Sequence, residues 1–309
     1  MLVRPAATFI GSPYVANLVD VTADFAVIGI PFGVPYDVRA INSDATNAPA
    51  ALRGRSQRFT AHMDRYDFDL GGTLFGATGA SIVDVGDVPG DPLDIAGNAN
   101  RSTEAISTLL AQGAIPIILG GDDSVPPFAV AAYKEHGPIN VIQIDAHIDF
   151  RDEVRGIRNG YSSTVRRITE MPWVSKVFQV GMRGTGSAYP SDFDDSLAAG
   201  NVIIRADDIH EHGVNYLLDQ LPGGQRYFIT MDVDGLDPAI APGTSAPLPG
   251  GLTWSQAAAL FRGVASRGSF AGMDVVEHFP SLDLGWRTSD TVTRLILNAI
   301  GTAARNRSR

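Results

Sequence analysis

The sequence predicts an α/β domain built on a parallel sheet, and three observations support this. Short runs rich in Val and Ile recur along the whole chain of 309 residues. Most of these runs are apolar almost without interruption, which is typical of parallel strands buried on both faces. Patterns typical of helices separate the runs, and this alternation favours helices layered on a sheet with right-handed crossovers. Since no linker, repeat or low-complexity tract interrupts the pattern, we treat residues 1–309 as a single domain.

Each predicted strand is an apolar run followed by Gly, Pro or Asp. The eight runs cover residues 25–31, 81–88, 115–122, 139–147, 176–183, 201–207, 226–234 and 270–277. The clear helical patterns between them cover residues 99–112, 127–135, 214–221, 255–264 and 290–304. Residues 33–47 and 149–159 read as long loops, and such loops in a compact domain are usually functional.

Composition excludes several classes of partner and chemistry. The net charge is −10, from 34 acids against 24 bases, and the absence of a long basic run argues against nucleic acid. The chain has no cysteine, which excludes disulfides, thiolate catalysis and cysteine-bound metals and fits a reducing compartment. Neither a signal-peptide pattern nor an apolar run of membrane-spanning length is present. We therefore expect a cytoplasmic protein with no membrane partner.

The most informative stretch is INVIQIDAHIDF, residues 139–150, in which an apolar run ends in polar residues at alternate positions: Asp145, His147 and Asp149. Side chains alternate along a strand, so these three are expected on one face. Two carboxylates and an imidazole are expensive to bury unless something neutralises them. A divalent cation suits this set of ligands. The alternative is that the acids are solvated or pair with Arg151 and Arg155.

A second stretch, MDVDGLDP, repeats this logic. Asp232 and Asp234 alternate at the end of an apolar run, and Asp237 then begins a turn. Ligands in open parallel sheets bind beyond the carboxyl ends of the strands, where these acids cluster. Two strand ends with paired carboxylates suggest two metal ions, which together can activate a water molecule for attack. The alternative is an acid-rich loop without metal.

A tight turn, GGDDSV, follows a third apolar run and carries Asp122 and Asp123. Its glycines allow close approach of the backbone. We favour Asp123 as a metal ligand and Asp122 as a residue that holds the loop. The alternative is that Asp123 or Ser124 caps the helix that follows.

These motifs resemble the signatures of the ureohydrolase family, which includes arginase, agmatinase and the guanidino-acid hydrolases. The resemblance extends over roughly residues 24–300 and rests on GIP at 29–31, GGDDS at 120–124, DAHID at 145–149, DVDGLDP at 232–238 and DVVEHFP at 274–280. It implies a three-layer α/β/α fold around a parallel, mostly eight-stranded sheet. It also implies hydrolysis of a guanidinium group to urea and an amine, a pair of Mn²⁺ ions, and a trimer or hexamer.

The resemblance also implies roles for individual residues. Asp145 and Asp232 would bridge the two ions. The remaining metal ligands would be Asp123 and Asp149 on one ion, and His147 and Asp234 on the other. Glu277 would accept hydrogen bonds from the substrate guanidinium, a planar cation that suits a planar carboxylate. The alternative for Glu277 is a structural ion pair.

The sequence departs from the family pattern at two places. The family usually has His where this chain has Asp123, so the ligand set becomes five carboxylates and one imidazole. We predict weaker activation of the attacking water or a different metal preference. The second departure is that residues 160–164, GYSST, contain no His, although arginases and agmatinases typically place a proton-shuttle His there. The candidate catalytic residues are thus Glu277, Asp149 and, as a proton donor, His278; the candidate substrate-binding residues are Glu277, Tyr161 and Ser162.

The leading hypothesis is a binuclear-metal amidinohydrolase that acts on a small, agmatine-like guanidino compound. One alternative is a hydrolase of guanidino acids. The substrate carboxylate could then bind to Arg151, Arg155 or Arg158, unless these arginines form a solvated charge cluster. Another is a catalytically impaired member that acts as a binding or scaffold subunit. A third, a deacetylase-like metal hydrolase, expects a His pair near the metal, which GGDDS does not offer.

Overall fold

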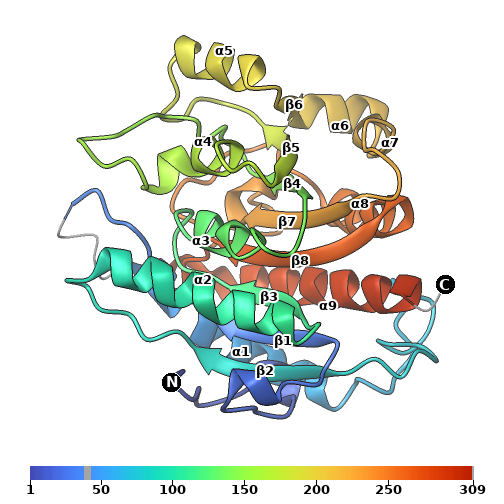
Figure 1. Cartoon of the computed structure of the whole chain (residues 1–309). Coiled ribbons are helices and arrows are strands. Elements are labelled where there is room, and N and C mark those ends of the chain that lie inside the picture. The colour runs from blue at the N-terminus through green and yellow to red at the C-terminus, as the bar shows by residue number, and fades with distance from the viewer. Residues whose placement is uncertain (38–42, 308–309) are drawn as a thin grey trace.

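A computed structural model describes residues 1–37 and 43–307 (Figure 1). Its centre is a sheet of eight parallel strands in the order β2-β1-β3-β8-β7-β4-β5-β6. The strands are β1 Phe25–Gly29, β2 Ile82–Asp87, β3 Ile115–Leu119, β4 Ile139–Ile144, β5 Val174–Met182, β6 Val202–Arg205, β7 Arg226–Asp232 and β8 Ser269–Val276. The predicted fold class is confirmed, and each predicted strand has a counterpart.

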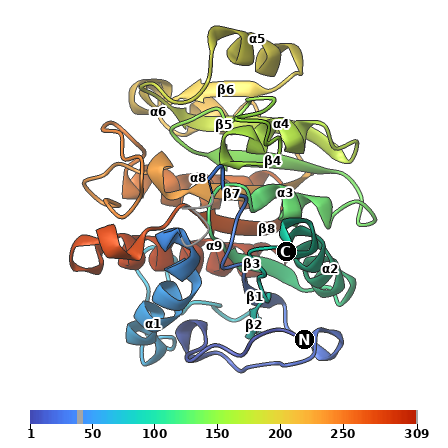
Figure 2. The same ribbon diagram turned by 90° about the vertical axis from the view of Figure 1, so that its left-hand side faces the viewer.

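Helices cover both faces of the sheet, so the fold has three layers (Figure 2). One face carries α2, α3 and α4, and the other carries α1, α6, α7, α8 and α9. The bounds are α1 Ala48–Thr60, α2 Ile95–Ala111, α3 Pro126–Ala131, α4 Thr164–Thr169, α5 Pro190–Ala198, α6 Ala206–His212, α7 Asn215–Leu218, α8 Trp254–Arg267 and α9 Arg287–Arg307. Alternate strand residues belong to two cores. Ala26 and Ile28 share one core with residues of α2 and α3, whereas Phe25 and Val27 share the other with residues of α8 and α9.

Four helices were not predicted from the sequence, namely α1, α4, α5 and α6. Helices α4 and α6 have six and seven residues, too few for an apolar period of 3.6 to repeat clearly. Helix α1 buries Arg53 and Ser56 on its inner face, so its polar residues hide the period. The predicted helix 127–135 is also too long, because α3 ends at Ala131.

The acids at the strand ends follow a different geometry from the one predicted. Strand β4 ends at Ile144, so Asp145, His147 and Asp149 lie in the loop that follows. Asp234 similarly lies in the 3-10 turn Val233–Gly235 after β7. The positions of these acids are therefore set by the turns after the strands and not by alternation along a strand.

Two further features complete the fold. The predicted loop 33–47 falls partly outside the described residues, and its last part forms the 3-10 turn Asp44–Asn47. Within residues 1–37 and 43–307, no helix is both long and apolar enough to span a membrane.

Candidate metal centre

A cleft of about 520 Å³ opens at the carboxyl ends of β3, β4, β7 and β8. The candidate residues that line it are Asp123, His147, Asp149, Asp232, Asp234 and Glu277. They come from four segments far apart in the sequence. The parallel sheet brings these segments to one edge, as expected for ligand sites in open α/β folds.

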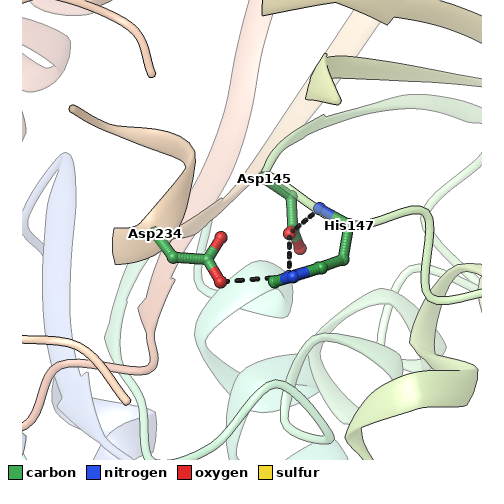
Figure 3. Close-up of side chains that lie close together, drawn as sticks. All are labelled: Asp145, His147 and Asp234. Carbon is green, nitrogen blue, oxygen red and sulfur yellow. Dashed lines mark hydrogen bonds and ion pairs between the residues drawn. The ribbon is translucent and has the colours of Figure 1, made fainter. Parts of the chain in front are cut away.

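The first group of possible metal ligands contains Asp145, His147 and Asp234 (Figure 3). His147 Nδ1 lies 3.1 Å from Asp234 Oδ2 and 3.5 Å from Asp145 Oδ1. Burial lowers the pKa of His147, but hydrogen bonds to the two carboxylates outweigh burial and raise this pKa to about 11. Either a proton on His147 or a metal cation would thus neutralise charge on the same two carboxylates.

The second group contains Asp123, Asp145 and Asp149, each of which offers a carboxylate oxygen within 4.8 Å of the other two. Burial, and then repulsion between the carboxylates, raises the pKa of Asp123 and of Asp149. Asp123 Oδ2 is buried without a hydrogen-bond partner among the described residues. An orphaned buried carboxylate oxygen beside two other acids fits a divalent cation.

Asp145 belongs to both groups, so two cations bound there would share it. Close backbone packing holds its position, because a Cβ on Gly235 would lie 2.6 Å from Asp145 N. Asp234 Oδ1 also accepts a hydrogen bond of 3.0 Å from Ala146 N. The turns after β4 and β7 are therefore locked together at the site.

Asp232 lines the same cleft but lies outside both groups. It is the last residue of β7 and is only 4% exposed. Its Oδ1 accepts a 2.7 Å hydrogen bond from Asp234 N. Asp232 thus fixes the turn that carries Asp234 and leaves a second oxygen for other contacts.

Glu277 follows β8 with a positive φ of 58°, a conformation that a non-glycine residue holds only when its surroundings impose it. Its Oε1 accepts a 2.9 Å hydrogen bond from Asp123 N, and its Oε2 accepts one of 3.2 Å from Ser245 Oγ. Burial, with the nearby charge of Asp122, raises the pKa of Glu277 to about 8. Both oxygens thus meet neutral donors rather than a basic side chain.

Tyr161 and Ser162 also line the cleft. The Tyr161 ring is tilted against Tyr36 with centroids 4.4 Å apart, and Ser162 N donates a 2.9 Å hydrogen bond to Tyr36 Oη. Tyr36, which sequence reasoning missed, thereby joins two segments of the cleft wall. The sequence carried no signal for Tyr36, because it sits in a loop without a pattern.

His278 is not brought to the cleft. It is fully buried, and its Nδ1 and Nε2 lie 3.2 Å from Gly243 O and 3.0 Å from Ser289 Oγ. Burial lowers its pKa. Adjacent residues point apart, and Glu277 occupies the cleft side, so the structure gives His278 no access to a leaving group.

The arginines near the metal motif are held elsewhere. Arg151 lies over the Tyr189 ring and donates to Ser187 O, and Arg158 pairs with Asp152 at 3.0 Å. Arg183 donates hydrogen bonds of 2.6 Å to Asp234 O and 2.7 Å to Leu248 O. It secures the backbone of the turn that carries Asp234.

Comparisons with known proteins identify relatives over most of the chain. A family model described as the arginase family matches residues 23–301. Guanidinopropionase from Pseudomonas aeruginosa is 32% identical over 270 residues, which cover 83% of this chain and 80% of the relative. The mitochondrial agmatinase of Gallus gallus is 29% identical over 298 residues, which cover 93% of this chain and 85% of the relative. The structure of proclavaminate amidinohydrolase from Streptomyces clavuligerus superposes with a TM-score of 0.83 and 28% identity over 98% of both chains.

Proposed function

This chain belongs to the arginase family, and from that premise we propose that it hydrolyses the guanidinium group of a small guanidino compound to urea and an amine. One observation carries the proposal. Acids from separate strand ends form two potential metal-binding groups that share the fully buried Asp145. The other members of both groups line a single cleft. A catalytically impaired scaffold has no reason to keep such an arrangement of buried carboxylates, since unneutralised burial of charge is costly.

We assign two Mn²⁺ ions to this site. Asp123 and Asp149 would hold one ion, His147 and Asp234 the other, and Asp145 and Asp232 would bridge them. When bound, a pair of divalent cations lowers the pKa of a water molecule and polarises the group under attack. Five carboxylates against four positive charges leave this donor set more negative than one with a second imidazole.

Glu277 would orient the substrate. A guanidinium offers N–H donors in one plane, and a carboxylate accepts two of them side by side. Hydrogen bonds from Asp123 N and Ser245 Oγ fix the plane of the Glu277 carboxylate. Tyr161 and Ser162, which line the same cleft, would contact the rest of the substrate.

Charge favours a substrate with a neutral or cationic tail, such as agmatine. Among the described residues that line the cleft there is no Lys or Arg. An acidic cleft concentrates cations and disfavours a free carboxylate.

Hydrolysis of a guanidino acid is the second candidate. Arg155 is exposed at the surface, and its charge acts to lower the pKa of Tyr161, which burial raises. Because its charge reaches Tyr161, which lines the cleft, Arg155 is the cation that we propose to meet a substrate carboxylate.

We further propose that the protein works in the cytoplasm as a trimer or hexamer. The absence of cysteine suits a reducing compartment, and the assembly follows from the ureohydrolase resemblance. Light scattering on the purified protein would report the mass of the assembly, and a monomer would contradict this part of the proposal.

A urea-release assay tests the activity. Protein loaded with Mn²⁺ is incubated with agmatine, arginine, guanidinobutyrate, guanidinopropionate and guanidine. We expect agmatine to give the fastest urea release. Fastest release from guanidinobutyrate would instead favour the second candidate. No bound metal and no urea from any of these compounds would support the scaffold interpretation instead.

A further inference from the structure

The loop that carries three of the metal ligands is held from below by two buried glutamines. Gln143 in β4 and Gln179 in β5 are paired across neighbouring strands, and their exposures are 1% and 0%. They face the side of the sheet covered by α3 and α4, as their neighbours Val141 and Val177 do. Each amide interrupts a run of apolar residues, a feature that is visible in the sequence.

Gln143 contacts the metal motif directly. Its Nε2 lies 2.8 Å from Asp145 Oδ2, 3.3 Å from Asp149 Oδ2 and 3.3 Å from His147 O. Asp145 is the carboxylate common to both metal-binding groups, and Asp149 belongs to one of them. A single amide therefore reaches ligand oxygens that have to point at the same cation.

Gln179 holds Gln143 in this orientation. Gln179 Nε2 donates to Gln143 Oε1 at 2.8 Å and to Ile148 O at 2.7 Å. Its own Oε1 accepts from Ser196 Oγ of α5 at 2.8 Å, and Ser196 Oγ accepts from Asn201 Nδ2 at 3.1 Å. The relay therefore runs from Asn201 through Ser196, Gln179 and Gln143 to the metal ligands.

The direction of every donor in the relay is fixed by its ends. Backbone carbonyls accept hydrogen bonds and cannot donate them. Gln143 must therefore turn its NH₂ toward His147 O, which also directs it at Asp145, and Gln179 must turn its NH₂ toward Ile148 O. Each remaining amide oxygen then faces the next donor, and aligned donors in a dry interior strengthen one another.

We propose that Gln143 is a positioning residue for the metal centre, oriented by Gln179 and Ser196 so that Asp145 and Asp149 are set for cation binding. This inference rests on the proposed function. It goes beyond it in assigning the geometry of the ligands to an amide relay anchored on α5. Partners that orient metal ligands typically contribute 10–100-fold to metal affinity or activity.

The test measures Mn²⁺ affinity by isothermal titration of the full chain. Gln143→Met keeps the length of the side chain and removes its donors, and we expect at least one Mn²⁺ step to weaken by roughly 10–100-fold. Gln179→Met leaves the donors of Gln143 in place but unsupported, so a smaller loss is expected. The double variant should bind no more weakly than Gln143→Met, because both changes act through the same contact.

Thr230→Val is the matched control. Thr230 pairs with Gln143 from β7, is equally buried, and has no contact with the glutamine relay among the hydrogen bonds of the described residues. It should keep parental Mn²⁺ affinity. Thermal melts of the metal-free proteins show whether each variant folds.

The possible outcomes separate the two proposals. A folded Gln143→Met protein with parental affinity for both ions overturns the positioning role, as does an equal loss in Thr230→Val. If Gln143→Met does not fold, Gln179→Met alone decides, and unchanged affinity there overturns the relay. A parent protein that binds no Mn²⁺ contradicts the proposed function instead.

Discussion

At the scale of single residues, Asp123 is the proposed ligand that departs from the pattern of the ureohydrolase signatures. It is 3% exposed, its Oδ2 lacks a partner among the described residues, and its backbone N–H holds Glu277. Carboxylate in place of imidazole adds a negative charge beside the cations. More negative ligands reduce the ability of a metal ion to acidify a water molecule.

Replacing Asp123 tests this effect. Asp123→His should raise kcat with Mn²⁺ by up to about tenfold, the rate change that corresponds to 1.4 kcal/mol, or shift the preferred metal. Asp123→Asn is the control and should lower the number of bound ions from two toward one. Steady-state urea release with Mn²⁺, Ni²⁺ and Co²⁺ gives the answer. Activity of Asp123→His below that of Asp123→Asn would contradict the charge argument.

Glu277 is predicted to act on the substrate and not on the metal. Glu277→Gln should lower kcat/KM by about 100-fold or more, since hydrogen bonds to charged groups contribute roughly 1.5–3 kcal/mol each. Metal content should stay unchanged. Ser245→Ala, which removes one donor to Glu277, should have a much smaller effect. Loss of metal in Glu277→Gln would instead indicate that Glu277 is a metal ligand.

The sequence identified these acids because each follows an apolar run that can only be a strand. It could not identify Tyr36 or Arg183, whose roles depend on a loop and on carbonyl groups that come close only in the folded chain. His278 was proposed as a proton donor because it follows Glu277, whereas the structure places it fully buried against Gly243 O and Ser289 Oγ.

At the scale of elements, helix α1 is joined to strand β2 by a buried ion pair. Arg53 Nε lies 2.8 Å from Asp84 Oδ2, with exposures of 1% and 0%, and Arg53 also contacts Asp87. Asp84 Oδ2 further accepts a 2.8 Å hydrogen bond from Phe9 N. The charges are thus satisfied on all sides, which is the condition for keeping them inside.

Breaking this pair should destabilise the protein strongly. Arg53→Met leaves the two aspartates without their cation, and we expect a loss of about 3–5 kcal/mol in the free energy of unfolding. Arg65→Met is the control, because Arg65 pairs with Asp64 at the surface, where both side chains are more than 70% exposed. Urea denaturation measures both. A small loss for Arg53→Met, like that of the control, would contradict the assigned role.

Strands were predictable because burial on both faces writes a nearly continuous apolar run into the sequence. Helix α1 was not, since the same buried Arg53 that ties it to β2 breaks its apolar stripe. The short helices α4 and α6 depend on packing against the sheet and its neighbours rather than on a local pattern.

At the scale of the whole molecule, the sheet buries several acids at once, and this links stability to pH. Asp274 in β8 is fully buried away from the described cations, and burial raises its pKa to about 8. Its ordinary pKa is near 4. Between these values the folded protein holds a proton that the unfolded chain releases, so the free energy of unfolding falls as pH rises.

Asp274→Asn should remove this dependence. For metal-free parent protein, we expect the free energy of unfolding to fall between pH 5 and pH 8, and to fall less steeply in the variant. Urea denaturation at the two pH values compares the slopes directly. Parallel slopes would show that Asp274 is already ionised at pH 5.

The three-layer architecture follows from alternating strand and helix patterns, but the strand order does not. Strands β4 and β7 are neighbours although more than 80 residues separate them. Only this order places Asp145 beside Asp234, and the turns after each strand then set the distances. The candidate metal-binding residues could therefore be predicted from the sequence, whereas the distances between them depend on the fold.

Anomalous diffraction at the manganese edge, on crystals of the Mn²⁺-loaded protein, tests the central claim most directly. We predict two peaks per chain about 3.5–4 Å apart, both within bonding distance of Asp145. A single peak, or peaks that do not share Asp145, would contradict the account of one binuclear centre.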